Sequence, residues 1–283
     1  LSCPVSKLYI VATPIGNLND ISARALRVLA ESDLIAAEDT RHTRRLLDHY
    51  DITQNILALH DHNERRQSGL VVDRILGGEA VALVSDAGTP LISDPGYVLV
   101  QQARAAGIAV EPIPGPSALT AALSVSGLPT DQFQFIGFLP SKGRETRIRE
   151  FADYVGTLVL YEAPHRIENL LGLIVKTFGP QRTVVICREL TKLYEQVIDG
   201  PAEALLSQVT EGIIPARGEL VVLVAGRDAV LDSATVTLDH CLDVLCAEMP
   251  VSAAASMASR ILGVKRNIAY KRALMRHQPD DQL

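Results

Sequence analysis

The chain has 283 residues, of which 47% are hydrophobic and 21% charged, so its composition is that of a folded globular protein and not of a disordered one. The formal net charge of −6 argues against a protein coated in nucleic acid, although it allows local basic patches. No apolar run approaches the roughly 20 residues of a membrane span, and the N-terminus has no signal-peptide pattern. We therefore expect a cytoplasmic protein without a membrane partner, long enough for two domains of ordinary size.

The cysteines and histidines give no sign of a metal site. The four cysteines, which have irregular spacings and form no CxxC pair, are Cys3, Cys187, Cys241 and Cys246. They are typical of reduced thiols in the cytosol. His60 and His62 form an i, i+2 pair that would point to opposite faces of a strand, so a polar loop is favoured over a metal site there. We expect no metal.

Five apolar segments alternate with helical patterns in the first part of the chain. The expected strands lie at 7–13, 34–38, 55–59, 81–85 and 108–113. The expected helices lie at 21–32, 43–50, 64–76 and 96–106. Because each crossover contains a helix, the strands should run parallel. We assign residues 1–115 to a parallel α/β domain.

The pattern changes after residue 116, beyond a small-residue helix that Ser117 can cap. Residues 132–139 alternate polar and aromatic side chains, which is typical of an antiparallel or mixed sheet with one solvated face. Further strands are expected at 157–163, 182–187, 194–199 and 219–225. We therefore predict a second, mixed α/β domain over residues 116–228.

Strand signals stop after residue 228, where helices at 238–247, 252–262 and 265–277 predict a helical domain over 229–283. Gly263 lies at the turn of a helix-turn-helix pattern. Six basic residues and no acidic one lie between residues 251 and 279. This asymmetry favours nucleic-acid binding, and the alternative is a helical cap with solvated cations.

A second basic stretch, PSKGRETRIR at 140–149, either contacts a phosphate backbone or starts a solvated helix. The predicted RNA-binding residues of the two stretches are Lys142, Arg144, Lys265, Arg266, Lys271 and Arg272.

The most informative stretch is VALVSDAGTPLISDPG at 81–96, where a buried strand runs into a loop of small residues, Gly and Pro. Loops at the carboxyl ends of parallel strands line ligand crevices. The stretch has no Lys or Arg, and the chain has neither GxGxxG nor GxxxxGK[ST], so a polyphosphate ligand is not expected. A second charge-free loop follows at 114–127. Two such loops favour a neutral or cationic ligand with a flat ring, such as S-adenosylmethionine, and ordinary tight turns are the alternative.

Polar residues also follow the second expected strand, where Asp39, Thr40, Arg41 and His42 occur together. This position favours function. In the alternative interpretation, Thr40 caps the next helix and its neighbours are solvated.

Seven motifs over nearly the whole chain resemble those of the tetrapyrrole methylase superfamily, and within it the small-subunit ribosomal RNA 2′-O-ribose methyltransferases. They are TPIGNLNDIS, AEDTRHTRRLL, LVSDAGTPLISDPG, PIPGPSALTAAL, SGLPTDQFQFIGFLP, LYEAPHRI and CRELTKLYEQ. The resemblance implies a two-lobed α/β fold with S-adenosylmethionine between the lobes, a homodimer, and methylation of a cytidine 2′-hydroxyl in 16S rRNA or the small ribosomal subunit.

The resemblance also implies which residues bind the cofactor. They are Asp86, Ala87, Gly88, Thr89, Pro90, Ile92, Ser117, Ala118, Glu162 and Leu190. Thr89 stands in place of the aspartate of the superfamily's GGDPxI loop, so Asp86 is included as its substitute. Glu162 and Leu190 stand where many relatives have Met and Gly. The superfamily's GxGPG turn is replaced by PIGNL at 14–18, which indicates a substrate other than a tetrapyrrole.

Transfer of a methyl group to a hydroxyl requires loss of the hydroxyl proton, and a nearby carboxylate or histidine assists it. The candidates at strand ends are Asp39, His42, Asp86 and Glu162, and we predict Asp39 and His42 as catalytic. Two other functions stay open. A corrin or porphyrin methyltransferase would explain the loops alone, and a non-enzymatic nucleic-acid-binding regulator would explain the basic tail alone.

Overall fold

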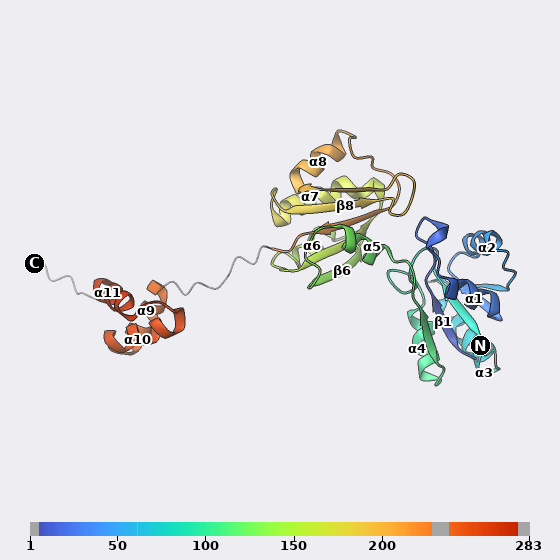
Figure 1. The fold of residues 1–283 in the computed structure, drawn as a ribbon, viewed down its shortest axis with the longest axis horizontal. Helices are drawn as coiled ribbons and strands as arrows, with labels where there is room; N and C mark the ends of the chain where they lie inside the picture. Colours follow the sequence, from blue (N-terminus) through green and yellow to red (C-terminus); the bar gives the residue numbers. More distant parts are fainter. Residues whose placement is uncertain (1–5, 61, 228–237, 277–283) are drawn as a thin grey trace, which may run out of the picture. The chain divides into compact units, whose positions relative to one another are not determined.

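The computed structural model describes residues 6–60, 62–227 and 238–276. The chain divides into two compact units, residues 1–227 and 228–283, and each is described by itself. The first unit contains two five-stranded sheets (Figure 1). The division of this unit into domains at residue 115 stays a prediction.

The first sheet is parallel, as predicted, with the strand order β3-β2-β4-β1-β5. Its strands are β1 (Leu8–Val11), β2 (Leu34–Ala37), β3 (Ile56–Ala58), β4 (Val81–Val84) and β5 (Val110–Ile113). Its helices are η1 (Leu18–Asp20), α1 (Ala23–Glu31), α2 (Thr40–His49), α3 (Glu64–Leu76) and α4 (Tyr97–Ala105).

Helices cover both faces of this sheet because successive strand residues point to opposite sides. Tyr9 of β1 packs in a cluster with residues of α1 and α2, whereas Leu8 packs with residues of α3 and α4. Strands β2 and β4 are buried along their whole length, which explains their continuous apolar sequences. The carboxyl ends of these central strands therefore lead directly to the loops singled out above.

The second sheet is mixed, as predicted, with the order β6-β7-β10-β8-β9. Its strands are β6 (Phe133–Phe138), β7 (Thr157–Glu162), β8 (Thr183–Arg188), β9 (Gln196–Pro201) and β10 (Leu220–Val224). Strands β6 and β7 are parallel, and the other pairs are antiparallel. Strand β9 begins two residues later than predicted because 189–195 form a turn, in which the Thr191 N–H donates to Glu195 Oε2 at 2.5 Å.

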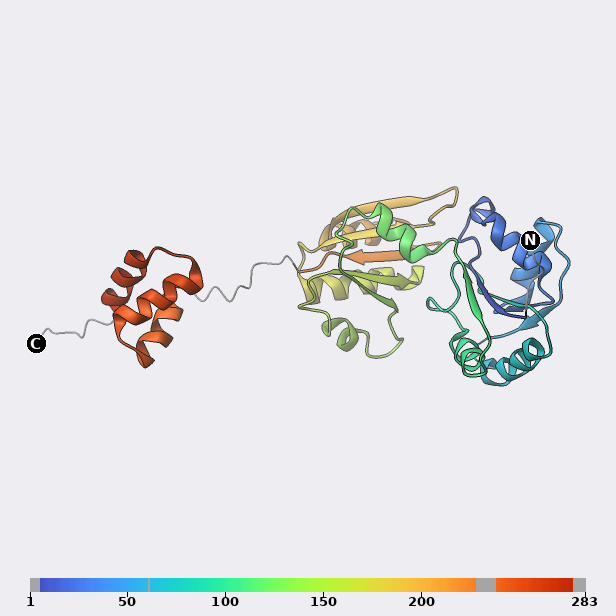
Figure 2. The ribbon, with the colours of Figure 1, turned by 60° about the horizontal axis from the view of Figure 1, so that its bottom comes forward.

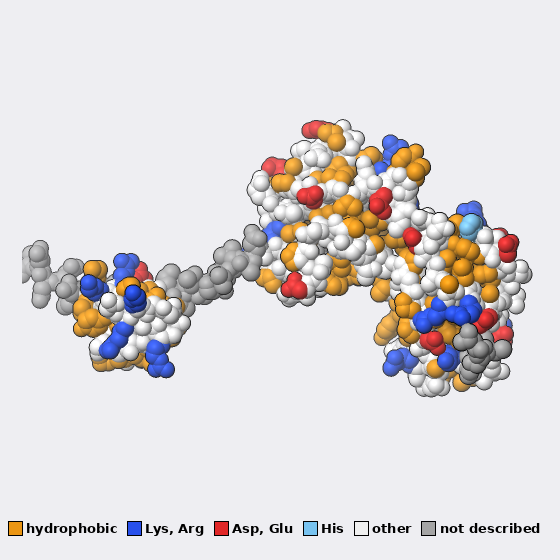
Figure 3. Space-filling view, in the orientation of Figure 1, with side chains coloured by type: hydrophobic (Ala, Val, Ile, Leu, Met, Phe, Trp, Pro, Cys, Tyr) orange, Lys and Arg blue, Asp and Glu red, His pale blue; other side chains and the backbone are white. Residues whose placement is uncertain are grey.

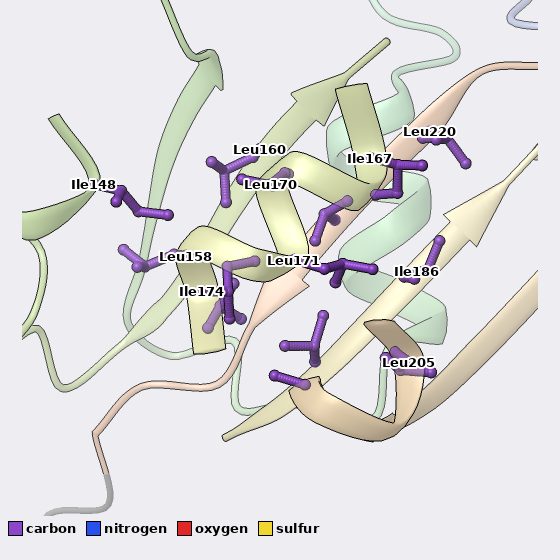
Figure 4. Close-up of a cluster of buried hydrophobic side chains, with 14 of the residues drawn as sticks. Ile148, Leu158, Leu160, Ile167, Leu170, Leu171, Ile174, Ile186, Leu205 and Leu220 are labelled. Carbon is purple, nitrogen blue, oxygen red and sulfur yellow. The ribbon is translucent and has the colours of Figure 1, made fainter. Parts of the chain in front are cut away.

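Helices also cover both faces of the second sheet. They are α5 (Ala118–Val125), α6 (Arg144–Arg149), η2 (Pro164–Arg166), α7 (Ile167–Phe178) and α8 (Ala202–Thr210). Residues of α6, α7 and α8 share one cluster, in which Leu170, Leu171 and Ile174 of α7 lie over the strands (Figure 4). Helix α5 packs on the opposite face. The stretch 140–149 thus holds the short helix α6, as its structural interpretation predicted.

The second unit contains helices α9 (Leu238–Glu248), α10 (Val251–Leu262) and α11 (Arg266–Arg276), which pack against one another (Figure 2). Gly263 ends α10 in the left-handed conformation with φ +66°, which confirms the predicted turn. The buried cluster of this unit is Cys241, Leu242, Ala258 and Ala273. Its small side chains let the helices approach closely.

We expect Leu171→Ala to destabilise the first unit by about 2–5 kcal/mol, since it removes a side chain with 0% exposure and leaves a cavity. Leu76→Ala is the matched control, because Leu76 is 62% exposed and the same truncation there should cost less than about 1 kcal/mol. Urea unfolding followed by circular dichroism measures both. Equal losses of stability in the two variants would contradict the packing described for α7.

Candidate active site

The loop after β4 is tied to the end of β1 by a two-way backbone bridge. The Thr13 N–H donates to Gly88 O at 2.9 Å, and the Gly88 N–H donates to Thr13 O at 3.1 Å. Gly88 has φ +86°, and a Cβ there would lie 3.3 Å from Ile15 Cγ2. The Thr89 hydroxyl donates to Pro116 O at 3.1 Å, which fastens the loop to the one before α5. These hydrogen bonds therefore fix the two small-residue loops relative to each other.

A cavity of about 320 Å³ lies against these two loops and the carboxyl ends of β6, β7 and β8. Eight of the ten predicted cofactor residues line it, namely Ala87, Gly88, Thr89, Ile92, Ser117, Ala118, Glu162 and Leu190. Pro90 is among the lining residues of no cavity described here, and Asp86 lines a neighbouring cavity. The structure thus brings the predicted set together, although contact of each residue with a cofactor stays a prediction.

The neighbouring cavity, which we call the second cavity, has a volume of about 310 Å³. Its wall includes residues 13–16, Asp86 and three residues of α2, His42, Arg45 and Leu46. Lys192 and Glu219 complete the wall from the side of the second sheet. Ile15, Ala87 and Glu219 line both cavities, so the two adjoin.

Asp39 caps helix α2, so the expectation that Thr40 caps it is wrong. The Asp39 carboxylate accepts the backbone N–H groups of Arg41 at 2.8 Å and His42 at 3.3 Å. The backbone and side-chain hydrogen bonds from Arg41 and the backbone hydrogen bond from His42 lower the Asp39 pKa. The Asp39 N–H donates in turn to Asp86 Oδ1 at 3.0 Å. Of the two predicted catalytic residues, His42 lines a described cavity and Asp39 does not.

Glu162 is buried in an ion-pair cluster at the end of β7. Its side chain is 1% exposed and pairs with the Arg144 guanidinium, whose side chain is 11% exposed. Arg166 Nε lies 3.5 Å from Glu162 Oε1, which also accepts the Ala163 N–H at 2.9 Å. In the described structure, the Nε and Nη1 groups of Arg144 are buried without a hydrogen-bond partner. Glu162 therefore anchors the 140–144 stretch beside the first cavity.

The other predicted RNA-binding residues lie at the surface. Lys142 is exposed just before α6, and Lys265, Arg266 and Lys271 are exposed on or beside α11. Figure 3 shows one face of the second unit, the unit of α9, α10 and α11, and Lys and Arg side chains lie on this face. Arg272 makes two hydrogen bonds to the Asp239 carboxylate, at 2.7 and 2.8 Å. Arg144 and Arg272 are therefore already paired, and RNA binding by the whole set stays a prediction.

Two side chains that line the first cavity and were not predicted as site residues, Cys187 and Tyr161, have shifted pKa values. Burial raises the pKa of Cys187 to about 12, with a smaller contribution from the charge of Glu195. Burial likewise raises the pKa of Tyr161 to about 12, against a hydrogen bond with the Leu119 backbone. Both residues lie within motifs quoted above, LYEAPHRI and CRELTKLYEQ, so the sequence contained a signal for them.

The positions of Arg45 and Glu219 in the wall of the second cavity were not predicted from the sequence either. Arg45 follows His42 by one helical turn, which was the available signal. Glu219 had none, because its position at both cavities depends on how β10 pairs with β7 and β8. Among the described residues, none of the helices is long and apolar enough to cross a membrane. No group of three or more metal-ligating side chains occurs among them either.

The family model of tetrapyrrole (corrin/porphyrin) methylases matches residues 7–206. The chain belongs to this family. A second model, described as the RsmI C-terminal HTH domain, matches residues 232–277. Ribosomal RNA small subunit methyltransferase I of Pseudomonas aeruginosa is 50% identical over 95% of this chain and 97% of its own. The enzyme of that name from Vibrio cholerae is 49% identical over 93% of each chain.

Solved structures agree with this tetrapyrrole methylase fold. Uroporphyrin-III C-methyltransferase from Thermus thermophilus has a TM-score of 0.56 at 19% identity, over 78% of this chain and 94% of its own. Diphthine synthase has a TM-score of 0.60 at 18% identity, over 77% of this chain and 89% of its own. The Thermus enzyme has also been solved with S-adenosyl homocysteine.

This tetrapyrrole methylase is an S-adenosylmethionine-dependent methyltransferase. The residues of the first cavity fit that cofactor. Among its described lining residues, no Lys or Arg is present to favour a phosphate, and apolar side chains such as Ile15, Leu190 and Val221 can cover a flat ring. Gly88 leaves room where a Cβ would meet Ile15. The small loops therefore let the backbone approach the ligand closely.

We expect Gly88→Val to weaken S-adenosylmethionine binding by about tenfold or more, because a β-branched residue at φ +86° is strained by on the order of 1–3 kcal/mol and the loop must shift. Gly69→Ala in α3 is the control, since a Cβ there meets nothing within 4 Å. Isothermal calorimetry measures affinity, and circular dichroism verifies folding. Unchanged affinity in a folded Gly88→Val protein would remove this loop from the cofactor site.

Proposed function

We propose that this methyltransferase modifies the 2′-hydroxyl of a cytidine ribose in 16S rRNA, within the small ribosomal subunit or its RNA. The observation that carries this proposal is the match of the C-terminal unit to a second family model, beyond the tetrapyrrole methylase match that ends at residue 206. Relatives similar over more than nine-tenths of the chain are named as ribosomal RNA small subunit methyltransferases. A corrin or porphyrin substrate would leave the C-terminal unit without a role.

The test is the fate of a labelled methyl group. Wild-type protein with methyl-labelled S-adenosylmethionine should label 16S rRNA in small subunits that lack the modification, and resistance of the labelled linkage to alkali should locate the label at a 2′-oxygen. Uroporphyrinogen III offered in parallel should stay unlabelled. Label in the tetrapyrrole alone, or in neither acceptor, would contradict the proposal.

In the proposed mechanism, the first cavity holds the cofactor and the second cavity holds the ribose. S-adenosylmethionine supplies, when bound, a methyl group on a sulfonium centre that is open to in-line attack. The protein's part is to align the hydroxyl with that methyl group, and such alignment supplies much of the rate. The wall shared by the cavities, formed by Ile15, Ala87 and Glu219, is where the two ligands would meet.

Proton removal is assigned to His42. It lines the second cavity from helix α2, whose start is fixed by Asp39 and, through the Asp39 N–H, by Asp86. The Asp39 carboxylate is engaged in helix capping, and its lowered pKa makes it a weaker base. His42 is therefore the better candidate of the two residues predicted as catalytic.

We expect His42→Ala to lower the single-turnover methylation rate by about 10²–10⁴-fold while both ligands still bind, since a general base acts in the transition state. His49→Ala is the control on the same helix, because His49 lines neither cavity. Rapid-quench measurements at saturating cofactor and small subunit give the rates. Equal rates for wild type and His42→Ala would mean that the proton goes to water or to the RNA.

We further infer that the exposed cations of the C-terminal unit bind rRNA phosphates. Neutralising Lys265, Arg266 and Lys271 to Gln should reduce the slope of log affinity against log salt by roughly 0.7–0.9 for each lost contact. Cofactor affinity should not change. A control with the same loss of charge carries Arg65→Gln, Arg66→Gln and Arg104→Gln on α3 and α4. If both triple variants have the same slope of log affinity against log salt as wild type, these cations do not bind RNA phosphates. The C-terminal unit is then a structural cap.

The homodimer is also a proposal. Edge strand β6 exposes Phe133 (43%) and Phe138 (54%), and the turn before β9 exposes Leu193 (88%). An exposed edge strand with large apolar side chains, such as β6, is a template for pairing with a second chain. Light scattering coupled to gel filtration would give the mass, and a monomer at all concentrations would contradict the proposal. The predicted cytoplasmic location stays a prediction.

A further inference from the structure

The second cavity contains a guanidinium group whose role the cofactor and the proposed base leave unexplained. Arg45 lies on α2 one turn after His42, and both line this cavity. The helical rise puts them about 4.5 Å apart along the axis on one face. A ligand at His42 in this cavity would therefore also lie near Arg45.

Arg45 differs from the other arginines of its helix. Arg41 pairs with Asp39 at 3.4 Å, and Arg44 donates to Gln54 O at 3.1 Å. Over the described part of the chain, no hydrogen bond or ion pair involves the Arg45 side chain. The other cation of the cavity, Lys192, is already held by Glu189 at 2.9 Å and Glu219 at 3.2 Å. Of the two cations of this cavity, Arg45 is thus the one whose side chain has no partner among the described residues.

The polar groups around Arg45 match a sugar phosphate. Asp86 uses Oδ1 to accept the Asp39 N–H, and its carboxylate has further lone pairs for ribose hydroxyls. A guanidinium presents a planar fork of donors that suits phosphate oxygens. The wall of the cavity thus offers a base, acceptors for ribose hydroxyls and a hydrogen-bond donor to a phosphate group.

We propose that Arg45 binds a phosphodiester group next to the target ribose and thereby holds the 2′-hydroxyl at His42. This inference rests on the proposed RNA substrate. It assigns Arg45 to RNA and not to the cofactor, because Arg45 lines the second cavity and is absent from the described wall of the first. The contact is distinct from the electrostatic binding proposed for the C-terminal unit, since it acts at the reacting nucleotide.

The first arm of the test compares Arg45→Gln with Arg104→Gln, a change at an exposed arginine of α4 that lines neither cavity. Arg45→Gln should lower kcat/KM for methyl transfer to small subunits by about tenfold to a hundredfold, as expected for loss of a charged hydrogen bond. Arg45→Lys should restore part of the activity. Arg104→Gln should stay within about twofold of wild type, and all variants should bind S-adenosylmethionine with wild-type affinity.

The second arm removes the charge from the RNA. Small subunits are reconstituted with 16S rRNA that carries one neutral methylphosphonate linkage on the 5′ or the 3′ side of the target nucleotide. One of these linkages should lower kcat/KM for wild type and Arg104→Gln, and should have little further effect on Arg45→Gln. This non-additivity identifies a direct contact, which a structural role of Arg45 would not produce.

The outcomes separate this inference from the proposed function. If wild type labels rRNA and Arg45→Gln is as active, the inference fails and the function stands. If both linkages lower the activity of Arg45→Gln as much as that of wild type, Arg45 does not contact these phosphates and the inference is overturned. If wild type binds S-adenosylmethionine but transfers no methyl group to RNA, the proposed function itself fails, and the inference fails with it.

Discussion

The reciprocal backbone bridge between Thr13 and Gly88 is the constraint on which both cavities depend. It joins the loops that leave β1 and β4, adjacent strands of the first sheet. Thr13 is buried, and its hydroxyl donates to Ser85 O at 3.3 Å, so the bridge sits on a rigid base. Ile15 and Ala87 flank the bridge and belong to both cavities. One pair of backbone hydrogen bonds thus sets the wall across which two ligands would face each other.

Ion pairs perform a comparable task on the other side of the first cavity. Glu162 would be costly to bury alone, and the two guanidinium groups of Arg144 and Arg166 offset that cost. The arrangement ties the chain before α6 to the end of β7. Lys192, in the turn between β8 and β9, lies against the loop after β1, since a Cβ at Gly16 would lie 2.4 Å from its Cγ. The charged side chains on this side of the cavities therefore hold loops together.

The architecture could be predicted from the sequence because strand and helix periods alternate clearly and the central strands are apolar throughout. The small-residue loops could also be recognised in the sequence, because few residue types tolerate such turns. The roles of charged residues were less predictable. Asp39 is predicted as catalytic, and the structure adds that its carboxylate caps α2. Arg144 is predicted to bind RNA, and the structure adds its ion pair with the buried Glu162. Arg45 gained meaning only when the fold placed it at a cavity. Partners distant in sequence decide these roles, and local pattern does not encode them.

The burial of the Cys187 thiol limits its reactivity toward an alkylating ligand. Thiolates, and not thiols, attack alkylating centres, and a methyl sulfonium is an alkylating centre. With its pKa raised to about 12, Cys187 in the cavity wall is almost wholly protonated at neutral pH. Burial therefore keeps this sulfur in the unreactive thiol form in the wall of the proposed cofactor cavity.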